Sequence, residues 1–392
     1  MVHHGGSSAF EELSQMKLLK KLGLLMVVGA IALACSSNDE EPTHNDPPGD
    51  GNGDAFDRSA MLANWADNII MPGYSDFQTS LTVLKVAVDE FNEAPDANKL
   101  STLRNSWYST YLTWQRISMF ETGPAESANY RLNINIYPTD PSLIESNIAN
   151  GSYNLALSSN RVAKGLPAMD YLLHGSGVND GAIINLFANN AAYRTYLTDI
   201  TVDMIELTDQ VAAAWSDGYR DTFVNNDGAS STASVDRMVN DYIYYFEKFL
   251  RAGKMGIPLG VFSGSVLNGN LEAYHEGTKA NELFLEGLDA VQDFFNGRHY
   301  SGNGSGESLA SYLNELNAVS DGENLSSLIN AQINSARSQV TGLDLFANEL
   351  EKAPPTPMLE AYDEVQKVVP LMKVDMVSAM SISIDFVDAD GD

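Results

Sequence analysis

The chain has 392 residues, and its 52 acidic against 23 basic side chains give a formal net charge of −29. Such a charge repels phosphate backbones and argues against nucleic acid as a partner, while it remains compatible with cations. The sequence holds one cysteine, which excludes an intrachain disulfide and a cysteine-based zinc site.

The first 34 residues have the pattern of an export signal. A basic stretch begins at Met16, an apolar run follows from Leu22 to Ala34, and the sole cysteine, Cys35, comes directly after it. The run is too short to span a bilayer comfortably and ends in small residues, as a cleavable signal does. Its end resembles the bacterial lipobox. We therefore predict an upstream extension and lipoprotein signal peptide over 1–34, with Cys35 carrying the lipid.

This anchor would place the protein in the cell envelope, at the outer membrane, facing either the periplasm or the cell surface. Residues 35–55 are rich in proline, glycine and acidic side chains and contain almost nothing apolar. Such a segment cannot bury a core. We predict that it is a flexible acidic tether.

From Phe56 onward apolar residues recur at the three- and four-residue steps of an amphipathic helix. The clearest runs are Leu100–Ile117, Ile243–Leu250, Phe284–Phe295 and Leu325–Leu343. Strand-like alternation is limited to two short pieces, Asn133–Tyr137 and Ser381–Val387, and neither is long enough to found a sheet. The pattern predicts an all-α protein.

Two helical bundles of similar length fit this layout. The polar stretch Ser216–Ser234 has few apolar residues and is the best candidate for a crossing between domains. We therefore predict an N-terminal bundle over 56–220 and a C-terminal bundle over 221–392.

Glu272 and His275 have the Glu-x-x-His spacing that places both side chains on one face of a helix. Di-metal bundles use this spacing but repeat it on a second helix, and this sequence has no second copy. An exposed helical pair and a metal site both remain open, and the first is the more common. No H-E-x-x-H motif occurs, so a conventional zinc peptidase centre is poorly supported.

Two further segments contain charged residues at suggestive positions. The segment Gly165–Gly175 is typical of a capped short helix, in which Asp170 has a structural or a functional role. Between Asp241 and Gly260, Glu247 and Arg251 form a favourable i, i+4 pair. The basic residues Lys248, Arg251 and Lys254 of this helix either grip an anionic ligand or pair with acidic neighbours.

Several segments in order resemble the imelysin family of bacterial envelope proteins. The matching stretches are Ile69–Tyr74, the helix with Trp107, Trp114 and Arg116 that leads into Phe120–Pro124, Ile136–Pro138, Gly165–Gly175, Lys254–Gly260, Glu272–Gly277 and Asp390–Asp392. The resemblance implies two helical bundles derived from a duplication, with a functional cleft between them. It covers essentially everything after the tether.

The family hallmark is G-x-H-x-x-E, and this sequence departs from it. Gly165 matches, but Pro167 stands at the histidine position and Asp170 at the glutamate position. Proline has no ligand atom, so the resemblance transfers only Asp170 as a metal ligand, with Glu121 as a second carboxylate to test beside it. In or beside the matching segments, the candidate ligand-binding residues are Arg116, Arg251, Lys254, Glu272 and His275.

Family members are also associated with iron uptake, and an oxygen-rich, histidine-poor site suits a hard cation such as iron better than zinc. Our leading hypothesis is a non-catalytic binding or accessory protein for iron or haem, with its site between the bundles and an outer-membrane uptake receptor as a partner. The alternative is a metallopeptidase, as the family name suggests. A third possibility is an interaction scaffold that takes up no metal.

Overall fold

The computed structural model describes residues 56–386, and the segments with apolar periodicity form packed helices in it. The predicted signal peptide, Cys35 and the tether lie outside the described residues, as does Asp390–Asp392. Residues 56–386 belong to one compact unit.

The first half of the described chain is made of long helices joined by short helical turns. Its elements are α2 (Arg58–Asn64), η1 (Trp65–Ile70), α3 (Met71–Glu93), α4 (Ala97–Ile117), α5 (Pro124–Ala128), α6 (Tyr130–Ile134), α7 (Pro141–Asn150), η2 (Ser158–Ala163), α8 (Gly165–Asp170), η3 (Tyr171–Gly175), α9 (Asp180–Asn189), α10 (Ala191–Ala214), η4 (Trp215–Tyr219) and α11 (Arg220–Asn225).

The second half is also helical and contains one small hairpin. Its helices are α12 (Ser234–Tyr244), η5 (Tyr245–Gly256), α13 (Ile257–Leu259), η6 (Asn268–Asn270), α14 (Ala280–Phe295), α15 (Leu309–Glu315), α16 (Leu325–Thr341), α17 (Phe346–Leu350), α18 (Thr356–Gln366), α19 (Val368–Pro370), η7 (Leu371–Met376) and α20 (Val377–Ala379). The strands β1 (Val319–Ser320) and β2 (Glu323–Asn324) pair antiparallel.

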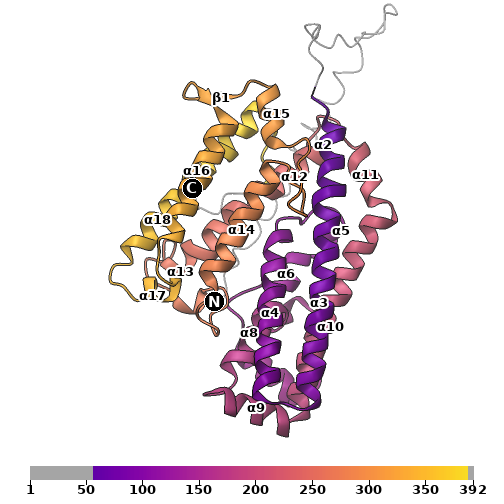
Figure 1. Cartoon of the computed structure of the whole chain (residues 1–392), viewed down its shortest axis with the longest axis vertical. Helices are drawn as coiled ribbons and strands as arrows, with labels where there is room; N and C mark the ends of the chain where they lie inside the picture. The colour runs from indigo at the N-terminus through magenta and orange to yellow at the C-terminus, as the bar shows by residue number, and fades with distance from the viewer. Residues whose placement is uncertain (1–55, 387–392) are drawn as a thin grey trace, which may run out of the picture. The chain divides into compact units, whose positions relative to one another are not determined.

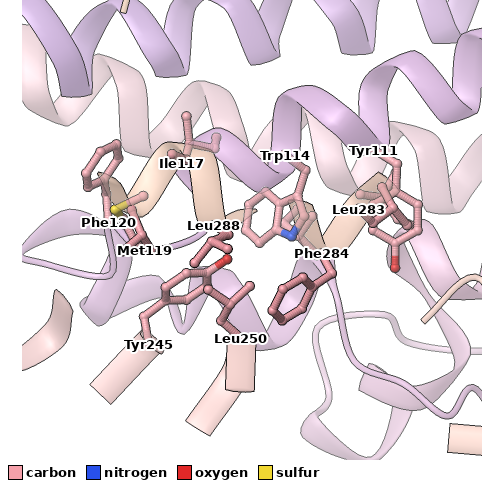
Figure 2. Packing of buried hydrophobic residues seen from close by; sticks show 14 of the residues in the cluster. Tyr111, Trp114, Ile117, Met119, Phe120, Tyr245, Leu250, Leu283, Phe284 and Leu288 are labelled. Atoms are coloured by element: carbon pink, nitrogen blue, oxygen red, sulfur yellow. The ribbon is translucent and has the colours of Figure 1, made fainter. Parts of the chain in front are cut away.

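Two groups of helices pack through their apolar faces. In the first, α3 contacts both α4 and α10, and in the second, α16 contacts both α14 and α18 (Figure 1). The contact between α4 and α14 joins the groups. Figure 2 shows Trp114 of α4 in this joint, with Phe284 and Leu288 of α14 and Leu250 of η5 nearby. All four side chains are removed from water.

The sequence explains where α4 begins and which face it buries. The Asp96 carboxylate accepts a hydrogen bond from the Lys99 amide at 2.9 Å, which caps the helix N-terminus. Leu103, Trp107 and Trp114 are fully buried along one face, at the spacing that the sequence predicts. Burial of these side chains stabilises the fold by about 25 cal/mol for each Å² of apolar surface removed from water.

The prediction of an all-α protein is confirmed, whereas one helical expectation is wrong. Glu272 and His275 lie in a run of turns between η6 and α14, not on a helix, and Ala273 between them has a positive φ of 54°. A left-handed residue breaks helical spacing, so the two side chains do not share a helix face. The domain boundary near residue 220 stays a prediction. The hairpin at Val319–Asn324 was not anticipated.

No helix between residues 56 and 386 is both long enough and apolar enough to cross a membrane.

Gly165 gives a stability test of the motif's first position. Its φ is +74°, and an added Cβ would lie 2.2 Å from the Ile134 carbonyl oxygen. Gly151 has a similar φ of +61° but open space around it. We expect Gly151→Ala to cost about 1–2 kcal/mol from backbone strain alone and Gly165→Ala to cost more, on the order of 3 kcal/mol or above, because a clash is added. Urea unfolding of both variants measures the difference, and equal losses would contradict the role of the clash.

Candidate functional site

Asp170 lies at the end of α8, only 2% exposed, beneath the turn formed by residues 271–277. Its Oδ2 accepts a hydrogen bond from the His275 amide at 2.8 Å, and its Oδ1 accepts one from the Glu276 amide at 2.9 Å. The Nδ1 of His174 lies 3.2 Å from Oδ1. Hydrogen bonds from backbone amides to a carboxylate are among the stronger ones in proteins. Asp170 therefore fastens this turn to the motif helix.

A cavity of about 110 Å³ opens beside this contact, with Asp170, Pro167, Tyr137 and His275 among its lining residues. The His275 imidazole packs edge-on against Tyr171, with ring centroids 5.2 Å apart. Burial lowers the pKa of His275, while Asp170 acts in the opposite direction. The imidazole is therefore neutral near pH 7, and a nitrogen lone pair remains for a ligand.

Gly175 explains how His275 fits there. A Cβ on this glycine would lie 2.4 Å from His275 Nδ1, so a larger residue would displace the ring.

A second polar cluster contacts the same turn, and its members Lys254, Gln115 and Glu272 are almost completely buried, while Asn135 is partly buried. Lys254 of η5 donates to Glu272 Oε2 and, at 2.8 Å, to Gln115 Oε1. Glu272 Oε1 accepts hydrogen bonds from Asn135 at 2.8 Å and from Gln115 at 3.1 Å. Burial lowers the pKa of Lys254, and the Glu272 carboxylate beside it opposes this shift. We call these four residues the buried quartet.

Glu121 lines a different cavity, of about 240 Å³, together with Arg131 and Asp241. The Glu121 Oε2 accepts a hydrogen bond from the Arg131 amide at 2.8 Å, and the Glu121 amide donates to Asp241 at 2.7 Å. Arg131 pairs with Asp241 at 3.1 Å. Burial raises the pKa of Glu121 to about 7, against the attraction of Arg131. Burial likewise raises the pKa of Asp241.

The two remaining predicted residues are held by other contacts. Arg116 donates to Glu286 at 3.2 Å and lies over the Tyr300 ring. Arg251 is 2% exposed, donates to Tyr362 at 2.5 Å, and lies 3.8 Å from Glu247, which confirms the predicted i, i+4 pair.

The predicted site residues thus fall into separate groups. Asp170 contacts the turn of His275, and Lys254 pairs with Glu272, whereas Glu121 lines a different cavity from Asp170. No three or more His, Cys, Asp or Glu side chains within 56–386 are grouped so as to hold a metal ion. The metal at Asp170 and Glu121 stays a prediction.

Sequence reasoning missed the neutral members of these groups. Gln115 lies on the Trp-rich helix, and Asn135 and Tyr137 lie in or beside the segment Ile136–Pro138, but no spacing rule connects these residues to Glu272. The one available signal was the polar side chain of Gln115 among the mostly apolar residues that this helix buries.

The family model for imelysin, described as a peptidase family, matches residues 70–368. A crystal structure of an imelysin-like protein from Psychrobacter arcticum is similar to this chain with a TM-score of 0.65 and 16% identity, over 86% of this chain and 99% of that one. A putative iron-regulated protein A precursor from Parabacteroides distasonis gives a TM-score of 0.67 and 17% identity, over 83% and 97% of the two chains. At these identities the likeness shows the fold alone.

One curated relative, the iron-regulated protein A of Synechococcus elongatus, is 24% identical over 90 residues. The match covers 23% of this chain and 25% of that protein, so the chain spans about a quarter of the relative's length.

Replacement of Asp170 tests its role in holding the turn. Asp170→Asn replaces one acceptor oxygen by an NH2 donor, so one of the amides of residues 275 and 276 loses its acceptor and the other keeps an uncharged one. We expect a loss of about 1.5–3 kcal/mol in unfolding free energy. Hydrogen exchange at these amides should accelerate. Asp180→Asn is the control, because Asp180 forms an exposed pair with Arg104 and its loss should cost under about 1 kcal/mol. Similar losses for both variants would contradict the assignment.

The raised pKa of Glu121 predicts a pH effect on stability. The unfolded carboxyl titrates near 4.5 and the folded one at about 7, so between these values the folded state binds more protons. Its contribution to stability is therefore present below pH 4.5 and is lost as the pH rises toward 7. We expect Glu121→Gln to gain stability relative to the parent chain from pH 5 to pH 7.5. Urea unfolding at several pH values measures this, and a constant difference would refute it.

Proposed function

The chain belongs to the imelysin family, and on that premise we propose that it is a non-catalytic binding protein of the bacterial cell envelope that serves iron uptake, with its site at the Asp170 cavity. The support comes from the relatives named iron-regulated protein A and from the chemistry of the cavity. The N-terminal pattern that ends at Cys35 supports a lipid anchor, and an outer-membrane uptake receptor is the expected partner.

The proposal rests on how few ligand atoms the altered motif offers to a metal. Pro167 offers no ligand atom, and both Asp170 oxygens already accept backbone hydrogen bonds. A catalytic metal centre needs about three protein ligands around an open position. The cavity offers one carboxylate, Asp170, and one imidazole, His275, with the hydroxyl side chains of Tyr137, Thr139 and Tyr274 also in its lining. This set suits a binding role better than hydrolysis.

The size and chemistry of the cavity also limit the ligand. At about 110 Å³ it is well below the roughly 300–1,000 Å³ of pockets that enclose large organic molecules. A hydrated or chelated iron ion fits this space better than haem does. Because the protein contributes few ligands, water or a small chelator would complete the coordination of the ion.

Iron binding by the full chain, purified in mild detergent, tests the proposal. We expect ferric citrate to load iron onto the protein in equilibrium dialysis, and His275→Gln to weaken this loading at least about 10-fold. His299→Gln is the matched control, because His299 packs near Gly304 and does not line the cavity. Its loading should equal that of the parent chain.

The same preparation distinguishes the competing functions. Metal-dependent cleavage of casein that disappears in Asp170→Ala would establish a metallopeptidase and overturn the binding role. The absence of iron loading together with the absence of cleavage would leave an interaction scaffold.

A further inference from the structure

A small cavity of about 20 Å³ lies next to the buried quartet, and Trp114, Tyr137, Lys254 and Phe249 are among its lining residues. This volume is enough for one water-sized group. The cavity is separate from the Asp170 cavity, although Tyr137 lines both.

Residues that line this inner cavity carry unused hydrogen-bond donors. The indole Nε1 of Trp114 is buried and has no hydrogen-bond partner among residues 56–386. An unpaired buried N–H costs about 1–3 kcal/mol, so its presence beside a cavity points to a missing acceptor. Figure 2 shows that the neighbours of this indole include the apolar side chains of Leu250 and Phe284.

Two more donors belong to the same lining. Lys254 has three N–H groups, and its hydrogen-bond partners within residues 56–386, Gln115 and Glu272, account for two of them. Burial raises the pKa of the Tyr137 phenol, so this hydroxyl keeps its proton at neutral pH. Tyr245, also in the lining, accepts a hydrogen bond from the Ser118 hydroxyl at 2.8 Å.

The nearby acceptors are already in use. Gln115 Oε1 accepts from Lys254, and Asn135 Oδ1 accepts from Tyr111 at 2.6 Å. The Glu272 carboxylate is occupied by the quartet and compensates the charge of Lys254. Arg131, which also lines the cavity, is paired with Asp241. A water in this cavity would also have to donate its own two hydrogens, and the nearby acceptors are in use, whereas a carboxylate oxygen only accepts. A single carboxylate oxygen therefore satisfies this lining better than a water does.

An outer cavity of about 160 Å³ adjoins the inner one and shares Asn135, Tyr137 and Phe249 with it. Ile136 and Ile257 add apolar surface to its walls, and the exposed side chain of Lys248 also lines it. An apolar space with a cation at its border and donors at its inner end matches a molecule with one apolar and one anionic end.

We infer that these adjoining cavities bind a small organic monocarboxylate, whose carboxylate faces Trp114, Tyr137 and Lys254 and whose apolar body fills the outer cavity beside Phe249. Binding of this ligand does not require iron at Asp170, so the two sites can be tested independently.

Calorimetric titration of the full chain with benzoate, and with benzamide as its uncharged isostere, tests the inference. We expect benzoate to bind at least about 10-fold more tightly than benzamide, because hydrogen bonds to a charged acceptor are the stronger ones. Trp114→Phe removes one donor and should weaken benzoate binding about 10-fold. Lys248→Ala should weaken it by a few-fold and reduce its dependence on salt.

Trp215→Phe is the matched control. Trp215 is also buried with an unpaired indole N–H but lines neither cavity, so benzoate binding should stay within about 2-fold of the parent value. Failure of benzoate to bind at millimolar concentration would mean that the inner cavity holds only water and would overturn the inference. Equal binding of benzamide, or equal effects of the two tryptophan variants, would also overturn it. If Trp114→Phe fails to fold, the Lys248→Ala result decides.

Discussion

The ammonium of Lys254 and the carboxylate of Glu272 are both almost completely removed from water, so each needs the other to remain charged. Breaking a buried pair by removing one partner costs about 3–5 kcal/mol, because a charge is left without compensation. Gln115 and Asn135 satisfy the remaining oxygen lone pairs, which is the condition under which such a pair is tolerated. Through these contacts η5, α4 and the turn at 271–277 are bound to one another.

The same turn is fastened from its other side. Glu272 points into the buried quartet, while the amides of His275 and Glu276 donate to Asp170. Two carboxylates, that of Glu272 in the turn and that of Asp170 in α8, therefore fix a segment that has no regular secondary structure. This explains how an irregular stretch can form the wall of a defined cavity, and why the altered motif keeps a carboxylate although its histidine position is a proline.

The helices were predictable from the sequence because a helix that buries one face has apolar residues at every third or fourth position, as in the run that contains Trp107 and Trp114. The turn around Glu272 was not predictable, because a three-residue spacing occurs in both helices and turns. The positive φ of Ala273, which distinguishes this turn from a helix, is visible only in the structure. Candidate charged residues were found individually. Their partners Gln115 and Asn135 were missed because they lie more than a hundred positions away from Glu272 and are uncharged.

Tyr137 lines the Asp170 cavity and both parts of the proposed carboxylate site. A ligand that displaces this phenol on one side necessarily reshapes the space on the other. By thermodynamic linkage, if occupation of either space alters affinity in its neighbour, the second ligand alters the first by the same factor. One aromatic ring thus gives a physical route for heterotropic cooperativity between the two ligands proposed for these spaces.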